Sequence, residues 1–133
     1  MKFTYTRFGI FYKPVVPVVF KFDDESITYQ ALVDTGSDVC IIHAEIAQQL
    51  GIILKDGLAR EFGGICGQGL GYIHTVDLSI GGNSINNVPV MFSHDIAPHG
   101  FGVLGHEGLF DRLKLNFEFG KKQFEIIPKT YNK

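Results

Sequence analysis

The sequence predicts a small, closed all-β domain with one or two short helices. Three observations support this fold class. Most apolar residues fall in short β-branched or aromatic runs, polar or glycine-rich turn signals separate these runs, and helical spacing is scarce. The chain has 133 residues, which suits a single domain with a substantial core, and we expect that domain to span residues 1–133.

The first two predicted strands form a hairpin that ends at an acidic residue. Residues 15–22 are β-branched and aromatic, and the prolines at the start of this run suit the beginning or the edge of a sheet. A polar turn at residues 23–26 leads into a second strand at residues 27–33. This arrangement places Asp34 at a strand end, on the loop that follows.

Further strands are predicted in the second half of the chain. Residues 72–80 carry apolar side chains on one face, and the turn at residues 81–84 leads to an apolar run at residues 88–92. A terminal hairpin is predicted around residues 120–122, because apolar residues alternate on both sides of that turn. The positions that define these faces are Tyr72, Val76, Leu78 and Ile80, then Leu115, Phe117 and Phe119, and finally Phe124 and Ile126.

Helices are predicted at two places. Apolar residues recur every four positions across residues 42–50, which indicates a helix at residues 44–50, and Gly51 suits its C-terminal cap. A second short helix is predicted at residues 106–112.

Composition and charge narrow the functional classes. The formal charge is -2 with acidic and basic residues interspersed, which argues against nucleic acid as a main partner. Cys40 lies in an apolar run, so we expect a buried, reduced thiol and a reducing compartment. The first residues lack the apolar core of a signal peptide, and no apolar stretch approaches the ~20 residues that span a bilayer. We therefore expect a soluble, cytoplasmic protein.

A single Asp-Thr-Gly triplet is the most informative feature of the chain. Asp34 ends an apolar run, and Thr35 and Gly36 follow it, so a carboxylate lies on a tight turn at the edge of the predicted core. The other candidate acids lack this context: Asp38 lies in the same loop, Asp77 lies in a predicted strand, and Asp95 and Asp111 lack a following hydroxyl residue and glycine. The chain thus carries one copy of the motif.

The order of the motifs resembles that of the retropepsin-like aspartic proteases. The triplet follows Leu-Val, a helix closes at Leu-Gly, and Val103-Leu104-Gly105 precedes a second helical segment. The resemblance covers residues 15–128. It implies a small closed β-barrel of the acid protease type with a glycine-rich flap hairpin, aspartic endopeptidase activity on a peptide or protein substrate, and neither a metal nor another cofactor.

The resemblance also assigns roles to the triplet. Hydrolysis by this class needs two carboxyls about 3 Å apart that share one proton. Asp34 would be one of them, Thr35 would hydrogen-bond across to the partner loop, and Gly36 would allow the tight turn. Because the chain has one triplet, the implied enzyme is a homodimer with Asp34 from each chain at the two-fold axis. Its contacts could come from residues 3–11 or from residues 123–127.

Two further segments match the family pattern. Residues 62–72 contain five glycines and resemble the flap that closes over a bound peptide. Val103, Leu104 and Gly105 resemble the element that packs beneath the catalytic loop. The predicted substrate-binding and support residues are therefore Gly63, Gly64, Ile65, Gly67, Val103, Leu104 and Gly105.

Several alternatives stay open at the level of sequence. Ser37 and Asp38 could tune Asp34 or only stabilise its turn, and Cys66 could be a redox-sensitive thiol or a small apolar side chain. The domain could be an inactive peptide-binding or dimerisation module. A metal-dependent hydrolase is a third hypothesis, although the spacing of its candidate ligands matches no strong zinc pattern and favours solvated surface. These ligands would be His94, Asp95, His99, His106 and Glu107.

Overall fold

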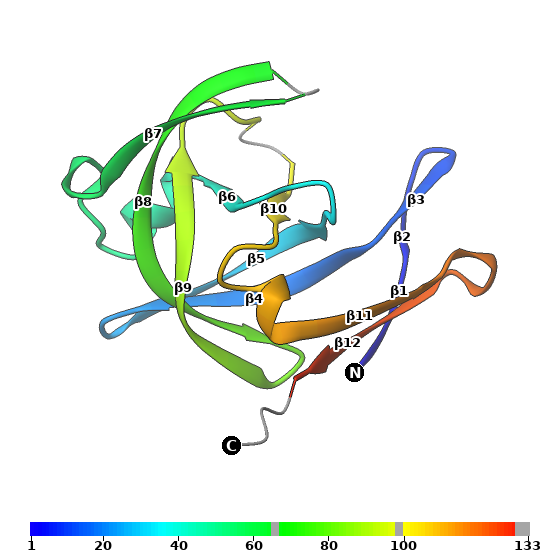
Figure 1. The fold of residues 1–133 in the computed structure, drawn as a ribbon. Coiled ribbons are helices and arrows are strands. Elements are labelled where there is room, and N and C mark those ends of the chain that lie inside the picture. The colour runs from blue at the N-terminus through cyan, green and yellow to red at the C-terminus, as the bar shows by residue number, and fades with distance from the viewer. Residues whose placement is uncertain (65–66, 98–99, 130–133) are drawn as a thin grey trace.

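The strand pairing gives a closed β-barrel of six strands. Figure 1 shows how these strands are arranged in the computed structural model. The structure describes residues 1–64, 67–97 and 100–129. Each strand pairs with the next, and pairing between the first and the last closes the ring. Around the barrel the strands are β4 (Val15–Phe22), β5 (Glu25–Val33), β10 (Gly102–Leu104), β6 (Cys40–His43), β9 (Asn83–Ser93) and β8 (Gly67–Ile80).

The predicted all-β class is confirmed, and the first hairpin has the predicted strands. β4 has the predicted bounds, whereas β5 begins two residues earlier than expected, because Asp23 adopts φ of 51° and lets the chain turn within two residues. Val16, Val18 and Phe20 alternate along β4 and are fully buried. Their side chains point into the barrel, which is where the core lies.

Helical structure is confined to short segments. The predicted helix is confirmed as α1 (Ala44–Gln49), which buries Ile46 and ends before Gly51 at φ of 77°. The prediction of a helix at residues 106–112 is wrong over its first half. Gly108 has φ of 76°, which breaks a right-handed helix, so only a 3-10 turn forms there. The 3-10 segments are η1 (Leu54–Asp56), η2 (Phe110–Arg112) and η3 (Phe119–Lys121).

A small second sheet joins the two ends of the described chain. β12 (Gln123–Pro128) lies between β1 (Lys2–Thr4) and β11 (Leu113–Glu118), so the predicted terminal hairpin is confirmed. Phe119 falls in η3 rather than in a strand and is 56% exposed.

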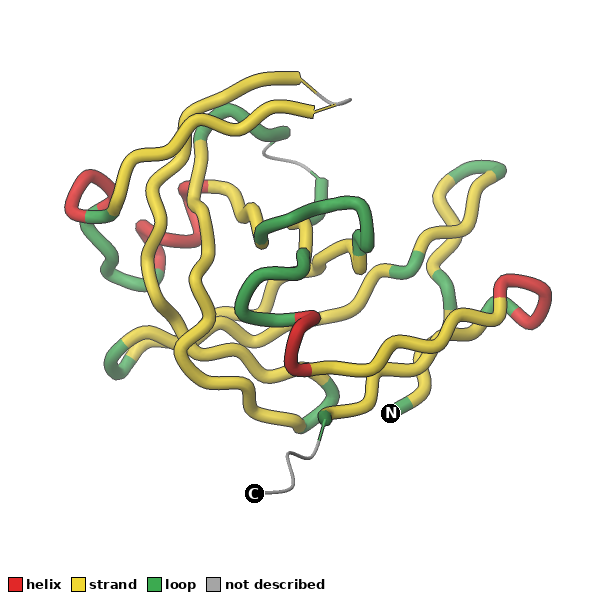
Figure 2. The backbone as a smooth tube through the Cα atoms, in the orientation of Figure 1, coloured by secondary structure: helices red, strands yellow, loops and turns green. Residues whose placement is uncertain are grey.

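A separate hairpin, which we call the N-terminal hairpin, follows β1. It consists of β2 (Thr6–Phe8) and β3 (Phe11–Lys13), which pair with each other. In Figure 2 the N-terminal hairpin and the turn between β11 and β12 project from the barrel in the same direction. Among the described residues, no helix has the length and apolar character needed to cross a membrane.

Candidate active site

The Asp34 loop begins where β5 leaves the barrel. β5 runs parallel to β10 with Val33 opposite Leu104, and the Asp34 N–H donates to the Leu104 carbonyl over 3.2 Å. The Ser37 N–H closes the turn by donating to the Asp34 carbonyl over 3.0 Å. Parallel pairing thus continues one residue beyond the strand and fixes the backbone at Asp34.

The Asp34 carboxylate is oriented by its own loop. Its Oδ1 accepts the Gly36 N–H over 2.9 Å, and the side chain is half-buried in the single chain. A Cβ atom at Gly36 would lie 3.3 Å from the same oxygen, which is a tight contact. Thr35 and Gly36 are exposed, so this part of the loop faces outward and is open to a neighbouring molecule.

Residues 104–107 support the Asp34 loop through backbone hydrogen bonds. The His106 N–H donates to the Ser37 carbonyl over 3.1 Å, and the Glu107 N–H donates to the Asp38 carbonyl over 2.8 Å. Val103 and Leu104, which the resemblance places beneath the catalytic loop, lie in β10 beside the end of β5. We call residues 104–107 the brace.

Gly105 allows the brace to approach the loop closely. A Cβ atom at this position would lie 2.4 Å from the Val39 carbonyl oxygen and 2.7 Å from that of Ser37. Both neighbours are backbone atoms, which cannot rotate away as a side chain can. Only glycine therefore fits here.

Cys40 packs directly behind the brace. Its Sγ accepts the Gly105 N–H over 3.4 Å, and the side chain is fully buried, as the sequence predicted. Burial raises the pKa of the Cys40 thiol from 9.0 to about 11, although the Gly105 hydrogen bond lowers it in part. The thiol is therefore neutral and unreactive at neutral pH.

His106 contributes a contact that the sequence did not predict. Its ring Nε2 lies 2.7 Å from the Thr35 carbonyl oxygen, and its ring meets the buried Phe110 edge-on, with centroids 5.4 Å apart. The two hydrogen-bonded residues are 71 positions apart in the chain. The one signal in the sequence was the place of His106 directly after Val-Leu-Gly.

The predicted flap corresponds to the hairpin of β7 (Leu58–Gly64) and the part of β8 that pairs with it, residues 67–73, which we call the flap hairpin. Figure 1 shows this hairpin extending away from the barrel. Of the predicted flap residues, Gly63, Gly64 and Gly67 lie near its end, and Gly64 pairs with Gly67. Ile65 and Cys66 lie outside the described residues.

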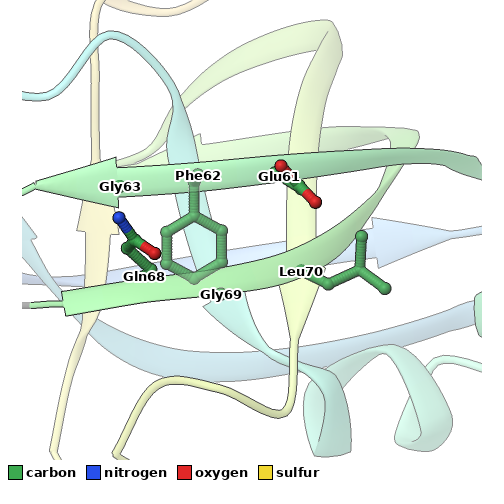
Figure 3. Close-up of a pocket in the computed structure, with 6 residues that line it drawn as sticks. All are labelled: Glu61, Phe62, Gly63, Gln68, Gly69 and Leu70. Atoms are coloured by element: carbon green, nitrogen blue, oxygen red, sulfur yellow. The ribbon is translucent and has the colours of Figure 1, made fainter.

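Residues of the flap hairpin line an open pocket of about 480 Å³, and Figure 3 shows this lining. The Phe62 ring lies across Gly69, where a Cβ atom would come within 2.7 Å of the ring and 2.6 Å of the Asp95 Cβ. Because Gly69 has no side chain, the Phe62 ring and the Asp95 side chain can both lie directly against its backbone. The lining residues are Glu61, Phe62, Gly63, Gln68, Gly69 and Leu70.

Two polar contacts fasten the flap hairpin to the end of β9. The Leu70 N–H donates to Asp95 Oδ2 over 2.8 Å, and the hydroxyl of buried Ser93 donates to the Leu70 carbonyl over 2.6 Å. The Ser93 oxygen also accepts the Asp95 N–H over 3.0 Å. Beyond the last β8–β9 pair, these hydrogen bonds from Ser93 and Asp95 to Leu70 hold β8 to the end of β9.

The candidate metal ligands take part in separate contacts. The His94 ring packs edge-on against His43, Asp95 binds the flap hairpin, and His106 binds the Asp34 loop. His99 lies outside the described residues. Across residues 1–64, 67–97 and 100–129, no group of three or more His, Cys, Asp or Glu side chains could hold a metal ion.

Comparison with known proteins agrees with this geometry. A family model described as "gag-polyprotein putative aspartyl protease" matches residues 20–110, which is more than half of the chain. No curated protein matches. A retropepsin-like aspartic protease from Rickettsia conorii has the same fold, with a TM-score of 0.63 and 18% identity over 96% of this chain and 98% of that one.

A second solved structure, the EIAV protease complexed with the inhibitor HBY-793, superposes with a TM-score of 0.56. It is 18% identical over 80% of this chain and 93% of that one. At these identities the superpositions show the fold, and the family match shows the relationship. The chain therefore belongs to the gag-polyprotein aspartyl protease family and has the retropepsin-like fold.

Proposed function

We propose that the protein is an aspartic endopeptidase that acts as a homodimer, with one Asp34 carboxyl from each chain. The observation that carries the proposal is the state of the Asp34 loop. Its carboxylate is held by the Gly36 N–H and by a braced backbone, yet the loop is exposed and the chain has a single Asp-Thr-Gly. A loop that fixes a single carboxylate and remains exposed is what we expect of one half of a carboxylate pair.

The proposed chemistry uses the two Asp34 carboxyls in opposite protonation states. When two carboxyls lie about 3 Å apart they share one proton, so one is ionised and the other is not. The ionised one takes a proton from water while the oxygen of that water attacks the peptide carbonyl carbon, and the protonated one gives its proton to the carbonyl oxygen. The carboxyl that took the proton from water then gives it to the nitrogen as the C–N bond breaks, while the other carboxyl takes a proton back from a hydroxyl of the tetrahedral intermediate. The products are a carboxylic acid and an amine, and the pair again holds one proton.

We propose that the two chains meet through the N-terminal hairpin. β12 is paired on both edges within its own chain, and Phe124 and Ile126 are buried there, which disfavours residues 123–127 as the contact. By contrast, the N-terminal hairpin exposes Ile10 by 80% and Phe11 by 66%. Exposed apolar residues that are neighbours, as these two are, are more typical of interaction surfaces than single ones.

The N-terminal hairpin is also connected to the Asp34 loop. The Pro14 carbonyl, directly after β3, accepts the Val33 N–H over 2.8 Å, one residue before Asp34. The Phe8 ring lies 5.2 Å from that of Phe101, which precedes β10. A second chain bound at this hairpin would therefore lie close to the exposed loop, where Thr35 of each chain could reach the other.

In this assembly the flap hairpin would cover an extended peptide. Its glycines allow the backbone to approach a substrate main chain, and its β7 edge is unpaired among the described strands. The proposed site needs no metal or other cofactor. A cytoplasmic location also stays a proposal, supported by the free and buried thiol of Cys40.

The test of this function is the Asp34→Asn variant. It should fold as the wild type does, because an amide oxygen can still accept the Gly36 N–H, but it should not cleave a peptide library at any pH between 3 and 8. Retention of cleavage would refute the assignment. Peptide binding by the wild type without any cleavage would instead favour the inactive binding module.

The dimer surface has its own test, based on the association state. Phe11→Asp should shift sedimentation toward the monomer and lower specific activity at low protein concentration. Ile53→Asp is the matched control, because Ile53 is 67% exposed but lies beside η1. If both variants associate as the wild type does, the N-terminal hairpin is not the contact.

A further inference from the structure

His106 makes two hydrogen bonds to the Asp34 loop from one position. Its N–H holds the Ser37 carbonyl, and its ring Nε2 lies 2.7 Å from the Thr35 carbonyl oxygen. A carbonyl oxygen has no proton to give, so Nε2 must carry the proton and donate it. The ring is therefore a donor to the loop, whichever protonation state the second nitrogen has.

The peptide group that receives this bond is the one that holds Asp34. The Thr35 carbonyl and the Gly36 N–H belong to the same peptide unit, and that N–H donates to Asp34 Oδ1 over 2.9 Å. The result is a chain of hydrogen bonds in one direction, from the His106 ring through the peptide to the carboxylate. Donors aligned in this way polarise one another and strengthen the last bond.

The position of the ring is itself fixed. The Phe110 ring, which is 5% exposed, packs edge-on against it, and the Asp111 N–H donates to the His106 carbonyl over 3.1 Å. His106 follows Gly105, whose backbone lies directly against the main chain of the loop. The imidazole is thus presented to the Thr35 carbonyl by a rigid segment even though the residue is exposed.

We propose that His106 is a positioning residue for Asp34, which orients and polarises the Thr35–Gly36 peptide so that its N–H holds the carboxylate. This inference rests on the proposed peptidase function for its effect on catalysis. The hydrogen-bond chain itself can be tested without any activity. The hydrogen bonds of His106 to the loop go to Thr35 and Ser37, so its action on Asp34 passes through the Thr35–Gly36 peptide.

The test compares three substitutions, each checked for folding by thermal denaturation. His106→Phe keeps a ring against Phe110 but has no donor, whereas His106→Gln restores an N–H. His74→Phe is the matched control, because the His74 ring Nε2 lies 2.8 Å from the Leu54 carbonyl, in the same kind of contact but away from the Asp34 loop.

Two readouts separate this inference from the proposed function. The amide proton of Gly36, observed by NMR, should move upfield in His106→Phe, return toward its original position in His106→Gln and stay unchanged in His74→Phe. In His106→Phe, kcat should fall about tenfold with KM unchanged, since one hydrogen bond to a charged system is lost. In His106→Gln, kcat should recover in part, and in His74→Phe it should stay unchanged.

The outcomes are distinct. A folded His106→Phe protein with an unshifted Gly36 amide overturns the inference, and so does an unchanged kcat in an active enzyme. If the wild type cleaves nothing but the Gly36 amide responds as expected, the proposed function fails while the hydrogen-bond chain from His106 stands.

Discussion

The Asp34 loop and the flap hairpin are attached to the same barrel in different ways. The loop is held by backbone hydrogen bonds to Leu104, His106 and Glu107 of the brace, and Gly105 lies in direct contact with its main chain. The flap hairpin, beyond the last β8–β9 pair at Tyr72, is held by contacts from Ser93 and Asp95 to Leu70. One region is fixed along its length and the other is fastened at its base.

This difference fits the two tasks that we propose. A carboxylate that must meet a second carboxylate needs a backbone that does not move, since a displacement of about 1 Å can lower a rate a hundredfold. A cover over a peptide must open and close, which favours a few contacts at its base over a continuous network. Substitutions in the brace should therefore affect kcat and stability, and those at the flap base should affect KM.

The largest effect is expected at Gly105. Gly105→Ala places a Cβ atom 2.4 Å from the Val39 carbonyl oxygen, so the brace and the loop must separate. We expect a loss of about 1–3 kcal/mol in the free energy of unfolding, measured by urea denaturation, because backbone must shift to admit the methyl group. Peptidase activity should fall about a hundredfold or more.

Gly120→Ala is the control for that substitution, because no atom lies within 4 Å of a Cβ at this position. Its stability should match that of the wild type within about 0.5 kcal/mol. Equal stability and activity of both variants would mean that the brace does not hold the loop.

A smaller effect is expected at the base of the flap hairpin. Asp95→Ala removes the acceptor of the Leu70 N–H, which should loosen the hairpin and raise KM about fivefold with little change in kcat, the equivalent of about 1 kcal/mol. Hydrogen exchange at the Leu70 amide should become faster at the same time.

Asp77→Ala tests whether that effect is specific to the flap base. Asp77 Oδ1 accepts the Asn87 N–H over 2.9 Å, so the bond is of the same type, but it lies at the far end of β8. This control should leave KM unchanged. A rise in KM of equal size in both variants would contradict a special role for Asp95.

The last effect concerns Cys40 and leaves stability at neutral pH unchanged. Because burial raises the pKa of this thiol from 9.0 to about 11, the folded state holds the proton more tightly than the unfolded state does. Its contribution to stability is complete below pH 9 and is lost as the pH rises from about 9 to about 11. Between pH 9 and 11, the unfolding free energy of Cys40→Ala should therefore fall less steeply than that of the protein that keeps Cys40.

Both proteins in that comparison should carry Cys66→Ser, so that a single thiol is titrated. The raised pKa values of Tyr5 and Tyr29, which are due mainly to burial, affect both proteins equally and cancel in the difference. Parallel stability curves between pH 9 and 11 would show that Cys40 is not protected in the folded state.

Much of the barrel could be predicted because its strands are long enough to show periodicity. β4 carries alternating buried residues over eight positions, and α1 has apolar residues every four positions followed by a glycine. The strands before Pro14 have three residues each, which is too short for any pattern. The failed helix at residues 106–112 depended on the left-handed Gly108, which composition alone does not reveal.

The Asp34 loop could be located from the sequence, but its support could not be worked out in full. Asp-Thr-Gly after an apolar strand is a local signal. The bond between His106 and Thr35 joins residues 71 positions apart, and the contact between Gly105 and Cys40 joins residues 65 positions apart. Such contacts exist only because β10 inserts between β5 and β6.

The central claim is that Asp34 of one chain is half of an active site, and subunit mixing tests it most directly. Wild-type protein at fixed concentration is equilibrated with increasing Asp34→Asn protein, under conditions that keep all chains dimeric. If both carboxyls are required, a threefold excess of the variant should lower activity to about a quarter, because mixed dimers hold one carboxyl. Activity that stays constant as the variant is added would contradict the account.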